Sequence, residues 1–326
     1  MKKVFISGIT GQDGIFLTKE IVVNNPKAMV IGATRNTNNK LFYERLKGLG
    51  INNFSNIKLV TIDLNNYTEV NTFITDMKPD AVFNLAGPSS VYDSIRNPSL
   101  GNEIIDIYTN ITNSLISDNN FCKFFQASSS EIFYDSSEPL NENSKLYANS
   151  PYAKAKIHCH KTGEELAKKY EWQIISGILF NHESEFRNKE FLITKIVNSA
   201  IRISRKQSKK LTVGSLDLKR DWSYASDIVK GFYDITKNGK SYSYVLGSGN
   251  CYSIKEILNM TFSFFSLDWK DYIEINPQLL RKGDPLKKVA NIDKIKNETG
   301  WSPEISLEET LEIIIESKLR NPITWQ

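Results

Sequence analysis

The sequence predicts an α/β fold, in which a Rossmann-type doubly wound parallel sheet is followed by a smaller mixed α/β lobe. Short β-rich runs alternate with longer amphipathic runs over the first 180 residues, and this alternation is typical of a parallel sheet with helices on both faces. The short runs are almost wholly apolar, as expected for strands that are buried on both sides. A glycine-rich turn directly follows the first run, at residues 8–14.

Each expected element corresponds to one such run. Strands are expected at residues 3–7, 29–33, 58–62, 81–85, 123–127 and 173–179, and the helices between them at 13–24, 41–49, 67–77, 101–117 and 151–170. Beyond residue 180, the pattern predicts helices at 191–205, 224–237, 253–265 and 306–317 and a strand near 244–246. We therefore expect a first domain at residues 1–180, with returning segments at about 215–249, and a smaller lobe at residues 181–326.

Composition limits the class of protein. The 326 residues are 40% hydrophobic, which suffices for a sizeable core, and the net charge is only +4. This charge requires no nucleic-acid partner, and we interpret the basic run at residues 205–210 as a solvated loop. No apolar run approaches the roughly 20 residues of a membrane helix. Because the three cysteines lie far apart and the three histidines form no metal-binding pattern, we expect a cytoplasmic protein with no disulfide framework, no metal and no membrane association.

The turn after the first strand has the composition of a phosphate-binding loop. Its three glycines form a Gly-x-x-Gly-x-x-Gly pattern between a strand and a helix. Glycines permit a tight turn and a close approach of the backbone to a pyrophosphate, and the helix N-terminus supplies N–H groups and a favourable dipole. An ordinary tight turn is the alternative. The expected dinucleotide contacts in this loop are Gly8, Thr10, Gly11, Gln12, Asp13 and Gly14.

Residues at the ends of the second, third and fourth strands are expected to contact the cofactor and to determine which cofactor binds. NAD-binding sheets place an acidic residue after the second strand, whereas Arg35 stands there in this sequence and can pair with a 2′-phosphate. The sequence therefore favours NADP over NAD, and a solvated Arg35 is the alternative. Asp63 is expected to accept a hydrogen bond from the adenine amino group or, alternatively, to cap the following helix. Further expected cofactor contacts are Leu64, Leu85 and Ala86.

A tyrosine and a lysine open the expected helix at 151–170. Ser150 suits the N-cap and Pro151 the first turn. Tyr152 and Lys156 are four residues apart and so project from one face of the helix. An ammonium group beside a phenol stabilises the phenolate, which makes the tyrosine a usable base. The pair is therefore expected to be catalytic.

The fifth strand ends in hydroxyl groups followed by a carboxylate. Residues 127–131 read Ala-Ser-Ser-Ser-Glu. Ligands of parallel sheets bind beyond the carboxyl ends of the strands, so Ser129 and Glu131 are expected to border the reacting centre. A carboxylate held there could act as the base for a carbon acid.

Together these motifs resemble the extended short-chain dehydrogenase/reductase superfamily and, within it, the GDP-mannose 4,6-dehydratase family. The resemblance covers essentially the whole chain. It rests on residues 8–14, 128–131 and 150–153, on Asn-His-Glu-Ser at 181–184 and on Arg-Asp-Trp at 220–222. It implies an NADP-binding first domain, a lobe that binds a GDP-sugar, and a homo-oligomer.

The resemblance also implies the reaction and its residues. Tyr152 would remove the C4 hydroxyl proton of the sugar, Ser129 would bond the same oxygen, and Glu131 would remove the C5 proton before water leaves from C6. Ser130 stands where dTDP-glucose dehydratases carry an Asp, which favours a GDP-sugar. The implied substrate contacts are Ser89, Asn181, Lys195, Arg220 and Arg281.

The sequence departs from the family pattern at several places. Only Arg187 keeps the charge of a paired-Arg site, and residues 36–40 lack the family's Ser- and Arg-rich stretch. In the family these segments meet at a tetramer interface, so both a dimer and a tetramer stay open. Residues 88–90 read Pro-Ser-Ser where the family has Gln-Ser-His, so a GDP-2-acetamido sugar such as GDP-N-acetylglucosamine stays open as substrate. A nucleotide-sugar 4-epimerase or 4-keto reductase also stays open as the activity, as does an ion pair of Arg220 with Asp221 or Asp227.

Overall fold

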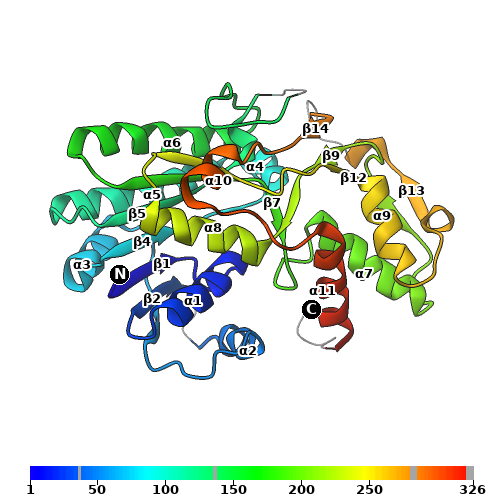
Figure 1. Ribbon diagram of the computed structural model, residues 1–326, viewed down its shortest axis with the longest axis horizontal. Helices are drawn as coiled ribbons and strands as arrows, with labels where there is room; N and C mark the ends of the chain where they lie inside the picture. Colours follow the sequence, from blue (N-terminus) through cyan, green and yellow to red (C-terminus); the bar gives the residue numbers. More distant parts are fainter. Residues whose placement is uncertain (36–37, 135–137, 280–284, 321–326) are drawn as a thin grey trace.

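The computed structural model describes residues 1–35, 38–134, 138–279 and 285–320. A seven-stranded sheet forms its centre (Figure 1), with the strand order β11-β6-β5-β4-β1-β2-β3 and every neighbouring pair parallel. Its strands are β1 (Lys3–Ser7), β2 (Met29–Thr34), β3 (Ile57–Thr61), β4 (Ala81–Asn84), β5 (Lys123–Ser129), β6 (Ile174–Leu179) and β11 (Ser243–Leu246). The order reverses between β1 and β4, and ligands of such sheets bind at this crevice, beyond the carboxyl ends of the strands.

Helices cover both faces of this sheet. On one face α1 (Gln12–Asn24) and α8 (Ala225–Asn238) pack together, with α2 (Lys40–Gly48) against α1. On the other face lie α3 (Tyr67–Met77), α5 (Ser99–Ser117) and α6 (Pro151–Tyr170). A hydrophobic core lies on each face of the sheet, and alternate residues of β1 point to opposite faces. Val4 and Ile6 belong to the first core, and Phe5 belongs to the second. The predicted fold class is confirmed.

The predicted strands agree with the observed ones to within two residues at each end, and the predicted helices to within three. Several elements that are too short to show a clear hydrophobic pattern were not predicted. They include α4 (Val91–Arg96), α10 (Asp293–Thr299) and the 3₁₀ turn η1 (Ser130–Ile132). Such elements are held by packing against their neighbours rather than by a pattern of their own.

The second half of the chain builds a separate core beside the sheet (Figure 1). Three helices, α7 (Leu192–Ser204), α9 (Ile254–Ser263) and α11 (Leu307–Arg320), bury their apolar faces against one another and against Trp222. Short strands complete this part, namely β8 (Leu211–Val213) with β13 (Ile273–Ile275), and β9 (Lys219–Arg220) between β12 (Tyr252–Ser253) and β14 (Lys287–Lys288). The basic run 205–210 lies in the mostly exposed turn between α7 and β8.

Strand pairing and returning segments of the chain join the halves. β7 (Asn181–Glu183) pairs in parallel with β10 (Trp222–Tyr224). After β10 the chain enters α8, which packs on the sheet, and then β11, which forms its edge. The domain boundaries themselves stay a prediction. In the described part of the chain no helix has the length and apolar character that crossing a bilayer requires.

Candidate active site

The glycine turn lies between β1 and α1, at the reversal of strand order. Gly8 has a φ of +73°, and a Cβ there would come within 3.1 Å of the Ala86 backbone. At Gly14 a Cβ would lie 2.4 Å from the carbonyl oxygen of Ile9. The N-cap of α1 is Gly11, which offers no side chain to the first N–H groups of the helix. These are the requirements of a phosphate-binding turn: a tight backbone and a helix N-terminus with free donors.

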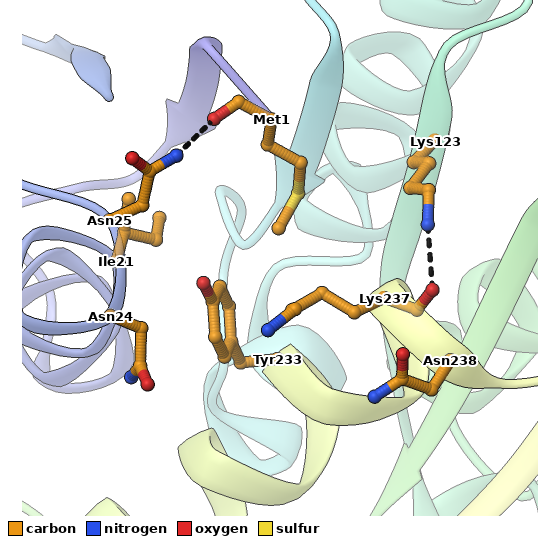
Figure 2. Close-up of a pocket in the computed structure, with 8 residues that line it drawn as sticks. All are labelled: Met1, Ile21, Asn24, Asn25, Lys123, Tyr233, Lys237 and Asn238. Atoms are coloured by element: carbon orange, nitrogen blue, oxygen red, sulfur yellow. Dashed lines mark hydrogen bonds between the residues drawn. The ribbon is translucent and has the colours of Figure 1, made fainter. Parts of the chain in front are cut away.

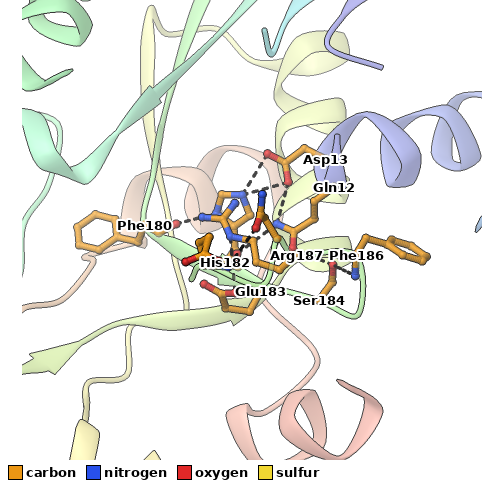
Figure 3. A network of polar contacts seen from close by, with 10 residues as sticks. Gln12, Asp13, Phe180, His182, Glu183, Ser184, Phe186 and Arg187 are labelled. Carbon is orange, nitrogen blue, oxygen red and sulfur yellow. Dashed lines mark hydrogen bonds and ion pairs between the residues drawn. The ribbon is translucent and has the colours of Figure 1, made fainter. Parts of the chain in front are cut away.

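Two polar residues of this turn, Gln12 and Asp13, are tied to the Asn-His-Glu-Ser segment (Figure 3). Gln12 donates to the carbonyl oxygen of His182 at 3.2 Å and accepts from the Ser184 hydroxyl at 2.8 Å. Nε2 of His182 lies 3.1 Å from both carboxylate oxygens of Asp13, and its Nδ1 lies 2.7 Å from the carbonyl oxygen of Phe180. Both ring nitrogens face acceptors, which favours the doubly protonated imidazolium. The network therefore fixes the glycine turn against the segment at residues 180–184, where the second half of the chain begins.

Burial and charge act in opposite directions on this pair. Burial by itself would raise the pKa of Asp13, but the charge and hydrogen bond of His182 and the nearby Arg187 hold that pKa below its ordinary value. Burial by itself would lower the pKa of His182, but Asp13 raises it above its ordinary value. The neighbouring Glu183 has a raised pKa because it is buried, although Arg187 lies 3.6 Å away and opposes the shift.

Replacing Asp13 by asparagine should lower the free energy of unfolding by about 2–3 kcal/mol, because the imidazolium loses its buried counter-charge but keeps an acceptor. The folded pKa of His182 is raised, so its contribution is complete below the unfolded value of about 6.5 and is lost as pH rises through the folded value. The folded pKa of Asp13 is lowered. Its contribution to stability is therefore complete above its unfolded pKa of about 3.9 and is lost as pH falls through its folded pKa.

Chemical denaturation at about pH 6 and about pH 9 measures this effect. The stability gap between wild type and Asp13→Asn should narrow at the higher pH. Asp76→Asn is the matched control, since Asp76 is exposed on α3. A gap of equal size at both pH values would show that His182 does not change its charge between them in the folded protein, which contradicts this expectation.

The predicted tyrosine–lysine pair lies on one face of α6. Ser150 caps this helix by accepting from the Ala153 N–H at 3.1 Å, as predicted. Tyr152 and Lys156 are each only 7% exposed. Nζ of Lys156 lies 5.6 Å from the centre of the Tyr152 ring and donates to the carbonyl oxygen of Ala127 at 2.7 Å. This bond joins α6 to β5, the strand that carries the predicted hydroxyl and carboxylate groups.

The end of β5 turns into η1, and this turn presents Ser129 and Glu131. The Ser129 hydroxyl accepts the N–H of Glu131 at 3.3 Å, which leaves its own proton to donate. Because α6 packs against η1, Ser129, Glu131, Tyr152 and Lys156 belong to one region at the carboxyl edge of the sheet. Their catalytic roles remain a proposal.

One charged residue of this region was not predicted. Lys288 of β14 is only 2% exposed, and its Nζ lies 3.5 Å from Oε2 of Glu131 and 3.4 Å from the carbonyl oxygen of Ser130. No local motif marks this lysine, because β14 has only two residues. Tertiary contacts, among them the pairing of β14 with β9 and the bridge between Leu140 and Ala290, bring Lys288 to η1.

A buried polar chain beneath the crevice was also missed. The Ser7 hydroxyl donates to Asn84 at 2.6 Å and accepts the N–H groups of Leu85 and Ala86, each at 3.0 Å. Asn84 in turn donates to Gln126 at 2.8 Å. This chain joins the ends of β1, β4 and β5 and fixes the backbone of Leu85 and Ala86, two expected cofactor contacts. The available signal was that each of these three buried strands, which are neighbours in the sheet, has a polar residue at or near its end.

The remaining predicted cofactor residues lie at the ends of their strands. Arg35 directly follows β2 and is exposed. Asp63 follows β3, and its carboxylate accepts the N–H of Asn65 at 3.0 Å. The alternative role for Asp63 was wrong, because Asn66 is the residue that caps α3. The carbonyl oxygen of Leu64 is bonded to Asn110 of α5 at 3.0 Å.

The predicted substrate residues divide into buried and exposed ones. Asn181 lies on β7 opposite Trp222, and Arg220 of β9 is 8% exposed. Ser89 is exposed before α4. Lys195 of α7 is about half exposed and pairs with Glu190 at 3.4 Å. Arg281 lies outside the described residues.

Asp221 and Asp227 were the alternative ion-pair partners expected for Arg220, and both carboxylates contact other residues. The Asp221 carboxylate accepts from Ser248, Gly249 and Ala290. The Asp227 carboxylate accepts the N–H groups of residues 304 and 305 and faces Lys230 at 3.5 Å. Both aspartates therefore fasten loops of the second half.

A cavity at the opposite edge of the sheet is a different feature (Figure 2). It measures about 290 Å³ and is lined by Met1, Ile21, Asn24, Asn25, Lys123, Tyr233, Lys237 and Asn238. Lys123 is the first residue of β5, whereas the predicted chemistry lies beyond its last residue. The cavity therefore is not part of the candidate active site. Over the described residues, no group of three His, Cys, Asp or Glu side chains is arranged to hold a metal ion.

Comparison with known proteins identifies the family to which this chain belongs. The family model described as GDP-mannose 4,6 dehydratase matches residues 5–314. The Arabidopsis thaliana protein named GDP-mannose 4,6 dehydratase 2 is 29% identical over 327 residues, which cover 98% of this chain and 87% of the relative.

Solved structures show the same fold. A dTDP-glucose 4,6-dehydratase from Bacillus anthracis in complex with NAD has a TM-score of 0.84 at 19% identity, covering 100% of this chain and 99% of that one. The protein RMD from Pseudomonas aeruginosa complexed with NADPH has a TM-score of 0.78 at 19% identity, covering 97% and 98% of the two chains. At such identities the likeness concerns the fold alone.

Proposed function

Because this chain belongs to the GDP-mannose 4,6-dehydratase family, we propose that it is a hydro-lyase that converts a GDP-hexose of the GDP-mannose type into the GDP-4-keto-6-deoxy sugar. One observation carries this proposal within the fold. Glu131 lies on the turn that ends β5, against the helix bearing Tyr152 and Lys156. A carboxylate at this place supplies a base for the C5 proton, which a 4-epimerase or a 4-keto reductase does not need. The family and its named relatives do not favour either of those two activities.

The first half of the reaction belongs to Tyr152, Lys156 and Ser129. Tyr152 takes the proton of the C4 hydroxyl, and the Lys156 ammonium beside its ring stabilises the phenolate that does so. The hydroxyl of Ser129, which already accepts a backbone N–H, donates to the same C4 oxygen. When bound, a nicotinamide coenzyme supplies the hydride chemistry, accepting the hydride of C4 and returning it to C6.

The second half belongs to Glu131. The C4 ketone acidifies the C5 proton, Glu131 takes this proton, and the electron pair of the C5–H bond forms a C5–C6 double bond as the C6–O bond breaks. The leaving hydroxide takes the proton from Glu131 and departs as water. The proton that Tyr152 received is released to solvent, and C5 takes up an equivalent proton from solvent. Every atom of the substrate is thus found in the product or in one water molecule.

The glycine turn fits the pyrophosphate of a dinucleotide. Its glycines leave no room for a Cβ at Gly8 or Gly14, and α1 begins without a side-chain cap. We propose NADP as the coenzyme, because the exposed Arg35 directly follows β2, where NAD-binding sheets carry an acidic residue, and its guanidinium can pair with a 2′-phosphate. Direct titration of the protein with NADP⁺ and with NAD⁺ tests this choice, and tighter binding of NAD⁺ would contradict it.

The substrate lobe supplies donors for a nucleoside diphosphate. Asn181 and the buried Arg220 are the proposed contacts, joined by Lys195, since a diphosphate requires amide and cationic donors. We further propose a homo-oligomer in the cytoplasm, where the three free cysteines would stay reduced. Sedimentation measures the oligomer, and a monomer would contradict it.

Incubation with GDP-, UDP-, CDP- and dTDP-hexoses tests the function. We expect GDP-mannose, with NADP⁺ present only in catalytic amount, to lose the mass of one water molecule. GDP-N-acetylglucosamine belongs in the same panel, because residues 88–90 leave the C2 substituent undetermined. Failure of every GDP-sugar to lose water would overturn the proposal, and net consumption of reduced coenzyme would indicate a 4-keto reductase.

A further inference from the structure

We propose that Lys288 is a positioning residue for the elimination step, which holds the carboxylate of Glu131 ionised and aimed at the substrate. This inference rests on the proposed function, because it concerns how the C5 base is prepared. It assigns a role to a residue that no sequence motif marks.

The contacts of Lys288 are those of a fixed ammonium group. Its Nζ lies 3.5 Å from Oε2 of Glu131 and 3.4 Å from the carbonyl oxygen of Ser130. Ser130 is the residue directly before Glu131, so the lysine contacts both the side chain of the base and the backbone that carries it. Two contacts to one turn orient Glu131, whereas a single contact to the carboxylate would only attract it.

Burial strengthens the attraction between Lys288 and Glu131. The side chain of Lys288 is 2% exposed and that of Glu131 is 12% exposed. A lysine is almost never buried so deeply unless it is paired. In the same surroundings a carboxylate without a nearby cation would be driven toward its neutral form. Each charge therefore stabilises the other, and their attraction is screened far less than at the surface.

Glu131 must be ionised before it can accept the C5 proton, and this is where Lys288 contributes. Once Glu131 has taken that proton, Lys288 faces a neutral carboxyl group, and the attraction is restored only when the proton passes to the leaving hydroxide. Lys288 therefore favours return of the proton to the C6 oxygen. This gives one carboxylate both roles, base at C5 and acid at C6, without a second acidic residue at Ser130.

Other charged groups share this region and must be distinguished from Lys288. Arg220 stands opposite Lys288 in the register of β9 and β14, and two adjacent cations repel. Lys156 is committed to the carbonyl oxygen of Ala127. Among described residues, the charged or titratable groups on segments that contact η1 include Lys145, Tyr147, Tyr152, Lys156 and Lys288.

The test compares Lys288→Met with Lys288→Arg and with Lys287→Met as the matched control. Methionine keeps most of the length of the side chain and removes the charge, whereas arginine keeps the charge. Lys287 is the preceding residue of the same strand and points to the opposite face. Two readouts are needed, the pH profile of kcat and KM, and the titration of Glu131 followed by carbon NMR of glutamate-labelled protein, with Glu131→Gln identifying the signal.

We expect Lys288→Met to move the titration of Glu131 to higher pH in the protein without substrate. The acid limb of the kcat profile should move with it, so that kcat at acidic pH falls about tenfold or more while KM changes little. Lys288→Arg should restore both readouts in large part, and Lys287→Met should change neither.

An unchanged Glu131 titration in Lys288→Met would overturn the inference, as would a loss confined to KM. If Lys288→Met does not fold, Lys288→Gln with Lys288→Arg as reference gives the same comparison. Failure of the wild type to dehydrate any GDP-sugar would instead contradict the proposed function, and the NMR titration would still report whether Lys288 controls Glu131.

Discussion

Glu131→Gln should lower the rate of water loss by about 10²- to 10⁴-fold, the usual effect of removing a positioned general base. Glutamine has nearly the shape of glutamate, and its amide oxygen can still accept from Lys288, so the turn of η1 should persist. The variant should keep the first proton transfer, because Tyr152 and Lys156 lie on α6 and do not depend on this carboxylate. The substrate is then oxidised but not dehydrated.

Mass spectrometry of the sugar nucleotide measures this effect directly. A second readout is the uptake of deuterium at C5 from heavy water, which should disappear with the base. Glu164→Gln is the matched control, since Glu164 is partly exposed on the same helix and forms an ion pair with Lys168. If Glu131→Gln forms the 4-keto-6-deoxy product at the wild-type rate, another group removes the C5 proton and our assignment is wrong.

Tyr152→Phe should lower kcat by a similar factor, about 10²- to 10⁴-fold, but at an earlier step. The ring is only 7% exposed and belongs to a buried apolar cluster. Phenylalanine keeps this packing and removes the oxygen that we propose takes the C4 proton. We therefore expect the folded structure and the affinity for the GDP-sugar to change little. The difference from Glu131→Gln is that neither oxidation nor dehydration occurs.

Equilibrium binding of GDP-mannose, measured beside turnover, separates these effects. Tyr170→Phe is the control on the same helix, since Tyr170 stacks on Phe121 far from η1. Residual turnover within tenfold of wild type would show that Tyr152 is not the base for the C4 hydroxyl.

The central sheet was predictable because each strand carries its own signal. A parallel strand that is covered on both faces must be apolar along its whole length, and the runs around Val4, Val82 and Phe124 satisfy this requirement without reference to their neighbours. The glycine turn was predictable for the same reason, since strand, turn and helix are contiguous. The smaller lobe was harder, because strands of two or three residues such as β9, β12 and β14 have no period.

The candidate site divides in the same way. Tyr152 and Lys156 are four residues apart on one helix, and Ser129 and Glu131 share one turn, so local geometry predicts that the members of each pair lie together. The polar chain from Ser7 to Gln126 was not predicted, although each member is visible in the sequence. Its hydrogen bonds join residues about 40 and 80 positions apart, and such bonds depend on which strands become neighbours.

The sequence by itself determined the fold class, the strands of the sheet, the glycine turn and the residues of the proposed chemistry. All of these are encoded in short contiguous segments, where spacing fixes relative position. The tertiary structure alone decided that Gln12 and Asp13 fasten the turn to His182 and Ser184, and that Lys288 contacts Glu131. Lys288 and Ser130 are 158 positions apart, and at that distance the pairing of strands, not the spacing of residues, determines which charge meets which.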